Sequence, residues 1–347
     1  MKTPIKLLAL LFLVTFSFSC DKTKEEEEEE EIQTELETNV YAVGFENTGG
    51  TSSTTIKLWK NGEVSNITDG TTLAYANSLY VSGSDIYIGG YENSIATVWK
   101  NGVATLLTDG SFRARVNSIF VSDGDVYAGG YEYQDGHAVA KIWKNGTSMA
   151  ISLDNELEAS FINSIFINNG DIYAVGEEDI DSKWTAKVWK NGVASSYGDT
   201  SKYVGGESIF VSDNNVYVAG NENTPDKYTV KVWKNGVSSI LESTYLPEAK
   251  SIFVLGDDIY VTGSEYIQGT EKTIARLWKN GEGTDLTDGL NRAQGQSVFA
   301  SDTDVYVVGY EYNGFKNVAM IWKNGEPTNL TDGTNNAIVT SVFVTTN

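Results

Sequence analysis

Seven glutamates recur at one place in a repeated pattern, and they are the residues best suited to chemistry. Each ends an apolar run that contains a Tyr and a Gly, and the seven are Glu46, Glu92, Glu132, Glu178, Glu222, Glu265 and Glu311. Calcium takes several hard oxygen ligands, so a ring of carboxylates could hold it. A residue that every repeat needs is usually structural, however, whereas a binding site is usually asymmetric. We therefore expect no cofactor, and calcium stays open as the one alternative.

Four aromatic residues break the repeat and mark the candidate ligand-binding site. Trp184 is the one Trp outside a recurring series, and a Tyr directly follows three of the repeated glutamates. Aromatic platforms beside carboxylates and amides are typical of sugar recognition, because the polar groups fix the ligand's orientation. An aromatic that only covers the rim of a loop is the alternative. The candidate residues are Trp184, Tyr133, Tyr266, Tyr312, Glu132, Glu265 and Glu311.

Little in the sequence supports an enzyme. The chain has a single His, His137, in a variable loop, so we expect neither a His-based triad nor a three-His metal site. Its single Cys, Cys20, excludes an intramolecular disulfide. A carboxylate pair for glycoside hydrolysis stays open, because the repeated acidic residues offer many pairs. We therefore predict no catalytic residues and expect a protein that is not an enzyme.

The elements that carry these residues belong to a repeat built on Trp-Lys-Asn-Gly. A repeat of this length indicates stacked supersecondary units. Asn-Gly between apolar runs is the strongest short-range hairpin signal, because a type I′ turn needs φ > 0 at both residues. Each unit therefore predicts four short antiparallel strands, with the Trp packed between units. The seven copies, 40 to 46 residues apart, start at Trp59, Trp99, Trp143, Trp189, Trp233, Trp278 and Trp322.

Apolar residues on both faces of the strands predict how the units are arranged. Each sheet needs a neighbour on either side to cover these faces. The first unit begins at Val40 without a first strand, and the chain ends in Ser341–Val344, a first strand without a second. The two fragments complete each other. We therefore predict an all-β fold, a seven-bladed β-propeller of four-stranded antiparallel blades, in which the C-terminal strand joins the N-terminal blade.

Two units contain a double glycine after an apolar strand, Gly89-Gly-Tyr91 and Gly129-Gly-Tyr131. This pattern resembles the double glycine of kelch propellers, and the resemblance implies a propeller over residues 40–347. The other five units have one Gly at this place. The period is closer to that of WD40 propellers, but their Gly-His and Trp-Asp signatures are absent.

The N-terminal region resembles that of an exported bacterial lipoprotein. Residues 1–19 combine Lys2 and Lys6 with an apolar run too short to span a membrane, which predicts a signal peptide. Ser17-Phe-Ser-Cys20 resembles a lipobox and implies lipidation of Cys20, with an ordinary signal peptide and an incidental Cys as the alternative. Residues 20–39 hold an unbroken run of Glu and predict a disordered acidic tether before the propeller at 40–347.

Charge and location together suggest a function. The formal net charge is −22, and an acidic surface repels phosphates, so we expect no nucleic-acid partner. We predict a monomeric binding or adhesion module, held at the outer membrane by its lipid alone and exposed on the cell surface. Its partner would be a glycan or an extracellular protein. Two alternatives stay open: a carbohydrate-active hydrolase or lyase with paired carboxylates on the acidic face, and a non-catalytic scaffold subunit of an outer-membrane complex.

Overall fold

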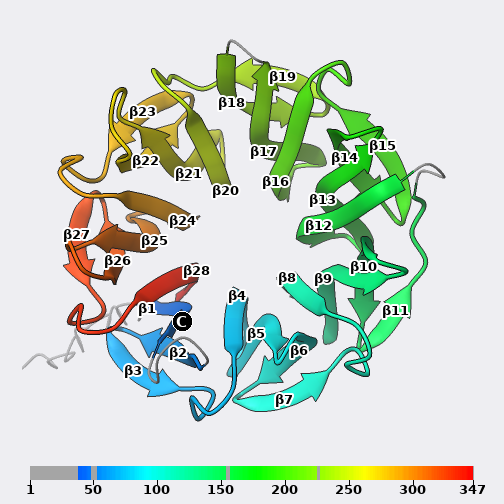
Figure 1. Ribbon diagram of the computed structural model, residues 1–347, viewed down its shortest axis with the longest axis horizontal. Coiled ribbons are helices and arrows are strands. Elements are labelled where there is room, and N and C mark those ends of the chain that lie inside the picture. The colour runs from blue at the N-terminus through cyan, green and yellow to red at the C-terminus, as the bar shows by residue number, and fades with distance from the viewer. Residues whose placement is uncertain (1–37, 48–52, 154–156, 225–226, 347) are drawn as a thin grey trace, which may run out of the picture. The chain divides into compact units, whose positions relative to one another are not determined.

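The computed structural model describes residues 38–47, 53–153, 157–224 and 227–346, which belong to one compact unit, Glu37–Asn347. These residues form seven four-stranded antiparallel sheets, arranged as blades around a common axis (Figure 1). In each blade the first strand lies innermost and the fourth lies outermost. The predicted all-β, seven-bladed propeller is therefore confirmed.

The strands of blades 1 to 4 have the following bounds. Blade 1 holds β28 (Ala337–Thr346), β1 (Thr38–Glu46), β2 (Thr55–Lys60) and β3 (Glu63–Asn66). Blade 2 holds β4 (Ala74–Ser82), β5 (Asp85–Glu92), β6 (Ile95–Lys100) and β7 (Val103–Leu106). Blade 3 holds β8 (Ala114–Ser122), β9 (Asp125–Gln134), β10 (His137–Lys144) and β11 (Thr147–Met149). Blade 4 holds β12 (Leu157–Asn168), β13 (Asp171–Ile180), β14 (Lys183–Lys190) and β15 (Val193–Tyr197).

Blades 5 to 7 continue the same order. Blade 5 holds β16 (Tyr203–Ser212), β17 (Asn215–Thr224), β18 (Lys227–Lys234) and β19 (Val237–Ile240). Blade 6 holds β20 (Pro247–Leu255), β21 (Asp258–Tyr266), β22 (Thr273–Lys279) and β23 (Glu282–Asp285). Blade 7 holds β24 (Ala293–Ala300), β25 (Val305–Tyr312), β26 (Asn317–Lys323) and β27 (Glu326–Asn329).

Blade 1 joins the two ends of the propeller. β28 pairs antiparallel with β1, from Thr38 opposite Thr346 to Glu46 opposite Ala337, and the two lie side by side in Figure 1. The C-terminal strand thus supplies the innermost strand of the N-terminal blade, as predicted. β1 begins at Thr38, slightly before the boundary at residue 40 that the repeat predicts.

The Asn-Gly turns join the third and fourth strands of every blade. Both residues of each turn have positive φ, for example 49° at Asn101 and 81° at Gly102, as a type I′ turn requires. The Asn side chain has a second role, because its Oδ1 accepts a hydrogen bond of 2.8 Å from the second strand, as from the Ile86 N–H in blade 2. The same bond recurs in all seven blades, which explains the repeated Asn.

The core consists of seven apolar layers, one between each pair of neighbouring blades. Between blades 1 and 2, for example, Val43 and Ile56 pack against Leu79, Ile88 and Trp99. The Trp of every Trp-Lys-Asn-Gly copy is at most 2% exposed. A buried Trp removes roughly 150–250 Å² from water, so these side chains dominate the layers. The predicted packing of the Trp between units is confirmed.

Two circles of contacts join the innermost strands around the axis. In the first, Ser78 Oγ accepts a hydrogen bond of 3.1 Å from the Ile119 N–H of the next blade. The equivalent bond recurs between all neighbouring blades. The second circle consists of aromatic rings with centroids 4.5 to 5.4 Å apart. Its members are Tyr80, Phe120, Phe166, Phe210, Phe253, Phe299 and Phe343.

Each innermost strand also contains a β-bulge. In blade 2 the pairing register shifts between Ala76 and Ser78 and leaves Asn77 unpaired in the ladder, and the other six blades shift at the same place. The Gly opposite the bulge is required by close approach, since a Cβ on Gly90 would lie 1.9 Å from the Tyr75 carbonyl oxygen. The seven bulged residues are Asn77, Asn117, Asn163, Glu207, Lys250, Gln296 and Thr340.

The predicted signal peptide, the lipidation site at Cys20 and most of the acidic tether lie outside the described residues. In the part of the chain that the structure does describe, no helix has the length and apolar character needed to cross a bilayer.

Candidate functional site

One face of the ring carries the ends of the second strands with their seven glutamates, and we call it the glutamate face. Hydrogen bonds place the loops between blades on the same face, since Thr72 donates to Glu92 and Asn335 donates to Glu46. Five of the glutamates pair with a basic residue on the third strand of their own blade. The pairs are Glu46–Lys57, Glu132–Lys141, Glu178–Lys187, Glu222–Lys231 and Glu265–Arg276. These contacts give five of the seven repeated glutamates a structural role.

The bulged residues near the axis break the repeat in blades 5 and 6. Asn77, Asn117 and Asn163 each donate a hydrogen bond of 2.7 to 2.9 Å to a carbonyl of the next blade's innermost strand. A carboxylate and an ammonium stand at this position in the next two blades. Glu207 has no hydrogen-bond or salt-bridge partner among the described residues, and Lys250 donates to a carboxylate of its own strand instead. The axis is therefore asymmetric on this side.

These two residues belong to a charged cluster with Glu177 and Glu248. Burial and the Glu207 carboxylate raise the pKa of Glu177 to about 8, although Asn163 donates a hydrogen bond to it at 3.3 Å. Burial also raises the pKa of Glu207. Burial acts to lower the pKa of Lys250, but the Glu207 and Glu248 carboxylates outweigh it and hold this pKa above its ordinary value. At neutral pH the cluster thus keeps Lys250 charged and Glu177 protonated.

An arc of aromatic side chains occupies blades 1 to 4 on the same face. Ring centroids lie 4.5 to 5.0 Å apart in the contacts between Phe45 and Tyr75, Tyr75 and Tyr91, and Tyr131 and Phe161. The Arg115 guanidinium covers Tyr91 at 4.3 Å from the ring centroid. The arc extends from blade 1 to blade 4 and the charged cluster from blade 4 to blade 6, so the two meet in blade 4.

One opening on this face is a groove where blade 5 meets blade 6. It joins a cavity of about 590 Å³ with a second cavity of about 400 Å³, and both are lined by Tyr203, Asn223 and Tyr228. Such volumes are in the usual range of ligand sites. The second cavity extends to Tyr266 and to the charged cluster at Glu207. We call this site the tyrosine groove.

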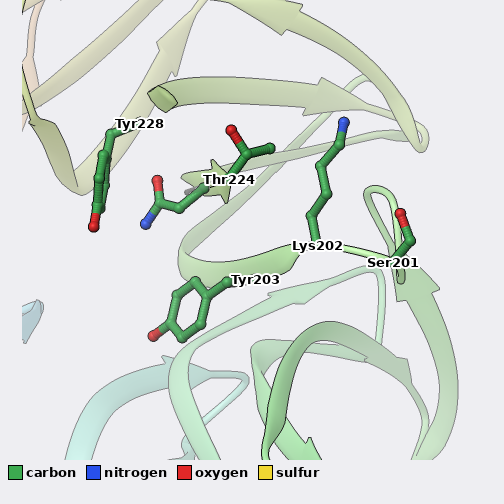
Figure 2. Close-up of a pocket in the computed structure, with 6 residues that line it drawn as sticks. Ser201, Lys202, Tyr203, Thr224 and Tyr228 are labelled. Carbon is green, nitrogen blue, oxygen red and sulfur yellow. The ribbon is translucent and has the colours of Figure 1, made fainter. Parts of the chain in front are cut away.

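The tyrosine groove combines exposed rings with an unpaired acceptor. Tyr203, Tyr228 and Tyr266 are 42%, 46% and 42% exposed. Asn223 Oδ1 is buried and has no hydrogen-bond partner, which is costly unless a ligand supplies a donor. Figure 2 shows the rings of Tyr203 and Tyr228 together at one side, while the Lys202 side chain points away from them. The groove can therefore stack a flat or apolar group and accept a hydrogen bond from it.

None of the three predicted site glutamates lines the tyrosine groove. Glu265 is 3% exposed and accepts hydrogen bonds from the backbone N–H groups of Thr244 and Tyr245. Burial opposes its charge, but these bonds and Arg276 hold the pKa of Glu265 below its ordinary value. Glu132 lies 3.6 Å from Lys141. Burial, with a smaller effect of Asp288, raises the pKa of Glu311.

The predicted aromatics lie in four different blades. Trp184 in blade 4 packs on Phe161 with ring centroids 5.5 Å apart. Tyr133 in blade 3 and Tyr312 in blade 7 are each covered by an Arg of their own blade. Tyr266 in blade 6 alone borders the tyrosine groove. The structure thus brings only one of the predicted aromatics to this site.

Sequence reasoning missed Glu177, Glu207, Glu248 and Lys250. A signal for two of them was present in the residue before the repeated Ser. This residue is Asn in blades 2 to 4 and changes to Glu207 and Lys250 in blades 5 and 6. The change is visible when each position of the repeat is compared across the seven units. The repeated carboxylates alone do not reveal it.

The described residues contain no group of three His, Cys, Asp or Glu side chains placed to hold a metal ion. His137 is exposed at the start of β10.

No family model matches this chain, and no curated protein matches it. Solved structures do share its fold. The uncomplexed acylaminoacyl peptidase of Pyrococcus horikoshii has a TM-score of 0.56 and 16% identity over 85% of this chain and 51% of that chain. Its orthorhombic crystal form has a TM-score of 0.53 and 15% identity over the same shares. This chain therefore spans about half the length of that peptidase.

A protease propeller is similar over nearly its whole length. The β-propeller domain of the Trilobed protease from Pyrococcus furiosus has a TM-score of 0.51 and 12% identity over 86% of this chain and 96% of that chain. Its description reports an open velcro topology, whereas β28 pairs with β1 here.

These neighbours correct the predicted function. The solved structures described above come from a peptidase and a protease, so the prediction of a glycan-binding adhesion module is wrong, and its two alternatives are set aside with it. The physical reason lies in the aromatics on which that prediction depended. Arg113 covers Tyr133, Arg292 covers Tyr312 and Phe161 contacts Trp184, so these rings form no common platform. This chain is therefore a seven-bladed β-propeller similar in fold to part of an acylaminoacyl peptidase and to the propeller domain of a protease.

Proposed function

We propose that this chain is a polypeptide-binding propeller, and that a segment of an unfolded or extended polypeptide lies in the tyrosine groove. The observation that carries the proposal is the pairing of exposed tyrosines with the buried, unpartnered Asn223 Oδ1. An extended peptide offers backbone N–H donors for this acceptor. Tyr203 and Tyr228 offer rigid contact area for its side chains at a low entropy cost.

The fold comparison supports a role with polypeptides. Both neighbours described above are peptidases, and this chain corresponds in length to about half of one and to the propeller domain of the other. We assign the chain the binding of polypeptide. The net charge of −22 favours partners with basic segments.

The test uses the full chain and a pool of fluorescein-labelled dodecapeptides, acetylated and amidated at their ends. We expect binding by fluorescence anisotropy, and a loss of about tenfold or more in the double variant Tyr203→Ala, Tyr228→Ala, because buried aromatic anchors are typical interface hot spots. Phe315→Ala is the control, since Phe315 is 85% exposed in the loop between β25 and β26, away from the groove. Equal binding by the double variant, or no binding by the unmodified chain, would contradict the proposal.

We also propose that the chain is exported as a lipoprotein, anchored at the outer membrane through Cys20 and exposed on the cell surface as a monomer without nucleic-acid partners. The apolar run and the Ser17-Phe-Ser-Cys20 sequence support this proposal. Cys20→Ser should move the protein from the membrane fraction to the soluble fraction, and unchanged partitioning would refute the anchor. We further propose that the propeller is related to kelch propellers, and the double glycines of Gly89-Gly-Tyr91 and Gly129-Gly-Tyr131 support this proposal.

A further inference from the structure

Two blades show what covers a tyrosine at the position of Tyr266. In blade 3 the Arg113 guanidinium lies 4.3 Å from the ring centroid of Tyr133, and in blade 7 the Arg292 guanidinium lies 5.8 Å from that of Tyr312. In both blades the Arg directly precedes the innermost strand, and its carbonyl accepts a hydrogen bond of 2.8 Å from the Tyr N–H. The fold thus places a guanidinium on this ring from a fixed backbone position.

Blade 6 has the tyrosine but lacks the arginine. Pro247 pairs with Glu265 as Ala114 pairs with Glu132, so the position of the missing Arg is occupied by Leu246. Tyr266 is exposed, at 42%, whereas Tyr133 and Tyr312 are half-buried. The ring of Tyr266 therefore offers a free face at the edge of the tyrosine groove.

The other groups of the groove suit a guanidinium. This group is planar, stacks on aromatic faces and carries five N–H donors in one plane. Tyr203 and Tyr228 supply two further rings, Asn223 Oδ1 is an unpaired acceptor, and Glu207 is a carboxylate without a hydrogen-bond or salt-bridge partner among the described residues. The rings can stack on the flat face of a guanidinium, and the acceptors can take hydrogen bonds from the N–H groups at its edge. Its positive charge is favoured in this acidic site.

The lysines beside the groove are already engaged. Lys202 Nζ lies 2.9 Å from Glu222 and 3.2 Å from Asp199, and its side chain points away from Tyr203 and Tyr228 in Figure 2. Lys250 Nζ lies 2.5 Å from Glu248. Neither ammonium is therefore positioned to cover Tyr266 in place of the missing arginine.

We propose that the tyrosine groove binds the guanidinium of an arginine side chain in the bound polypeptide, stacked on Tyr266 as Arg113 and Arg292 are stacked on the tyrosines of their own blades. The proposal rests on the polypeptide binding proposed above and names the residue that the groove selects. The groove recognises an arginine side chain of the partner, so binding does not require the charged N-terminus of a peptide.

The experiment compares three labelled heptapeptides of Gly and Ser with one central Arg, Lys or citrulline, each acetylated and amidated to remove the terminal charges. We expect the full chain to bind the Arg peptide at least about tenfold more tightly than the citrulline peptide, which keeps the shape but loses the charge, and about threefold more tightly than the Lys peptide. Tyr266→Ala should remove this preference. Tyr266→Phe should retain it, because the ring stays in place.

Tyr312→Ala is the matched control, since it removes an equivalent rim tyrosine that Arg292 already covers. It should leave the preference for Arg unchanged. Citrulline or Lys peptides that bind as tightly as the Arg peptide would overturn the proposal while binding of the mixed dodecapeptide pool still stands. Because citrulline changes the ligand and not the protein, this comparison holds even where a variant folds poorly. If neither the pool nor the Arg peptide binds, polypeptide binding itself falls.

Discussion

Replacing Glu177 by Gln should change how the stability of the propeller depends on pH. In the folded protein, burial and the neighbouring Glu207 raise the pKa of Glu177 from an ordinary 4.5 to about 8. Between these values the folded state holds a proton that the unfolded chain has released. The free energy of unfolding therefore falls as pH rises. The stabilisation is complete below pH 4.5 and is lost as pH rises through about 8.

The size of the effect follows from the shift. One pKa unit corresponds to about 1.4 kcal/mol, so the shift sets an upper bound of roughly 5 kcal/mol. Glu177 is partly exposed, and solvent screens part of its charge, so we expect about 1–3 kcal/mol between pH 5 and pH 9. Glu177→Gln keeps the hydrogen-bonding shape without a titrating proton. The variant should therefore lose this part of the pH dependence and be more stable than the unmodified protein at pH 9.

Urea unfolding at pH 5, 7 and 9 measures the effect directly. Glu222→Gln is a control of opposite sign, because hydrogen bonds from Lys231 and Lys202 overcome burial and lower the pKa of Glu222. Its carboxylate stabilises the fold above the ordinary pKa and loses this effect as pH falls, so the control variant should be destabilised at pH 7 and less so in acid. The same slope of stability against pH in Glu177→Gln and the unmodified protein would refute the reasoning.

Three further predictions concern the architecture. Gly130→Ala should destabilise the protein by at least about 2 kcal/mol in urea unfolding, because a Cβ would lie 2.0 Å from the Arg115 carbonyl oxygen, and an unchanged midpoint would contradict the close approach. Trp278→Ala should cost about 3–5 kcal/mol, since Trp278 is 0% exposed between blades 5 and 6, and a cost under about 1 kcal/mol would count against that packing. Removing residues 341–347 deletes most of the pairing between β28 and β1 and should lower the melting temperature strongly, whereas a truncated chain that melts like the full one would argue against closure.

The fold was predictable because one local rule is repeated seven times. Asn101-Gly102 alone indicates a hairpin, and Trp99 alone indicates a buried ring. Seven copies at a nearly constant spacing turn these local indications into a blade count.

The site was less predictable because it depends on pairing between strands. Tyr133 and Tyr266 follow the same kind of glutamate in sequence, yet Arg113 covers one and Leu246 stands near the other. The covering residue lies twenty positions earlier in the chain and meets the ring only through the register of two strands. The bulge that turns Glu207 toward the groove depends equally on register, and a list of repeated carboxylates does not contain Glu207 at all.

Because the blades are near-copies, the tyrosine groove can be compared with the equivalent positions in the other blades. The pair of positions beside the repeated glutamate holds Arg113 with Tyr133 in blade 3 and Arg292 with Tyr312 in blade 7, so the chain fills these places itself. Blade 5 holds Tyr203 opposite Asn223 and leaves both at the surface of one cavity. Blade 6 holds Tyr266 at the tyrosine's position but has Leu246, with φ of 44°, at the position of the arginine. A partner that brings an arginine meets a ring that blade 6 already holds at the border of the groove, and preorganisation of this kind lowers the entropy cost of binding.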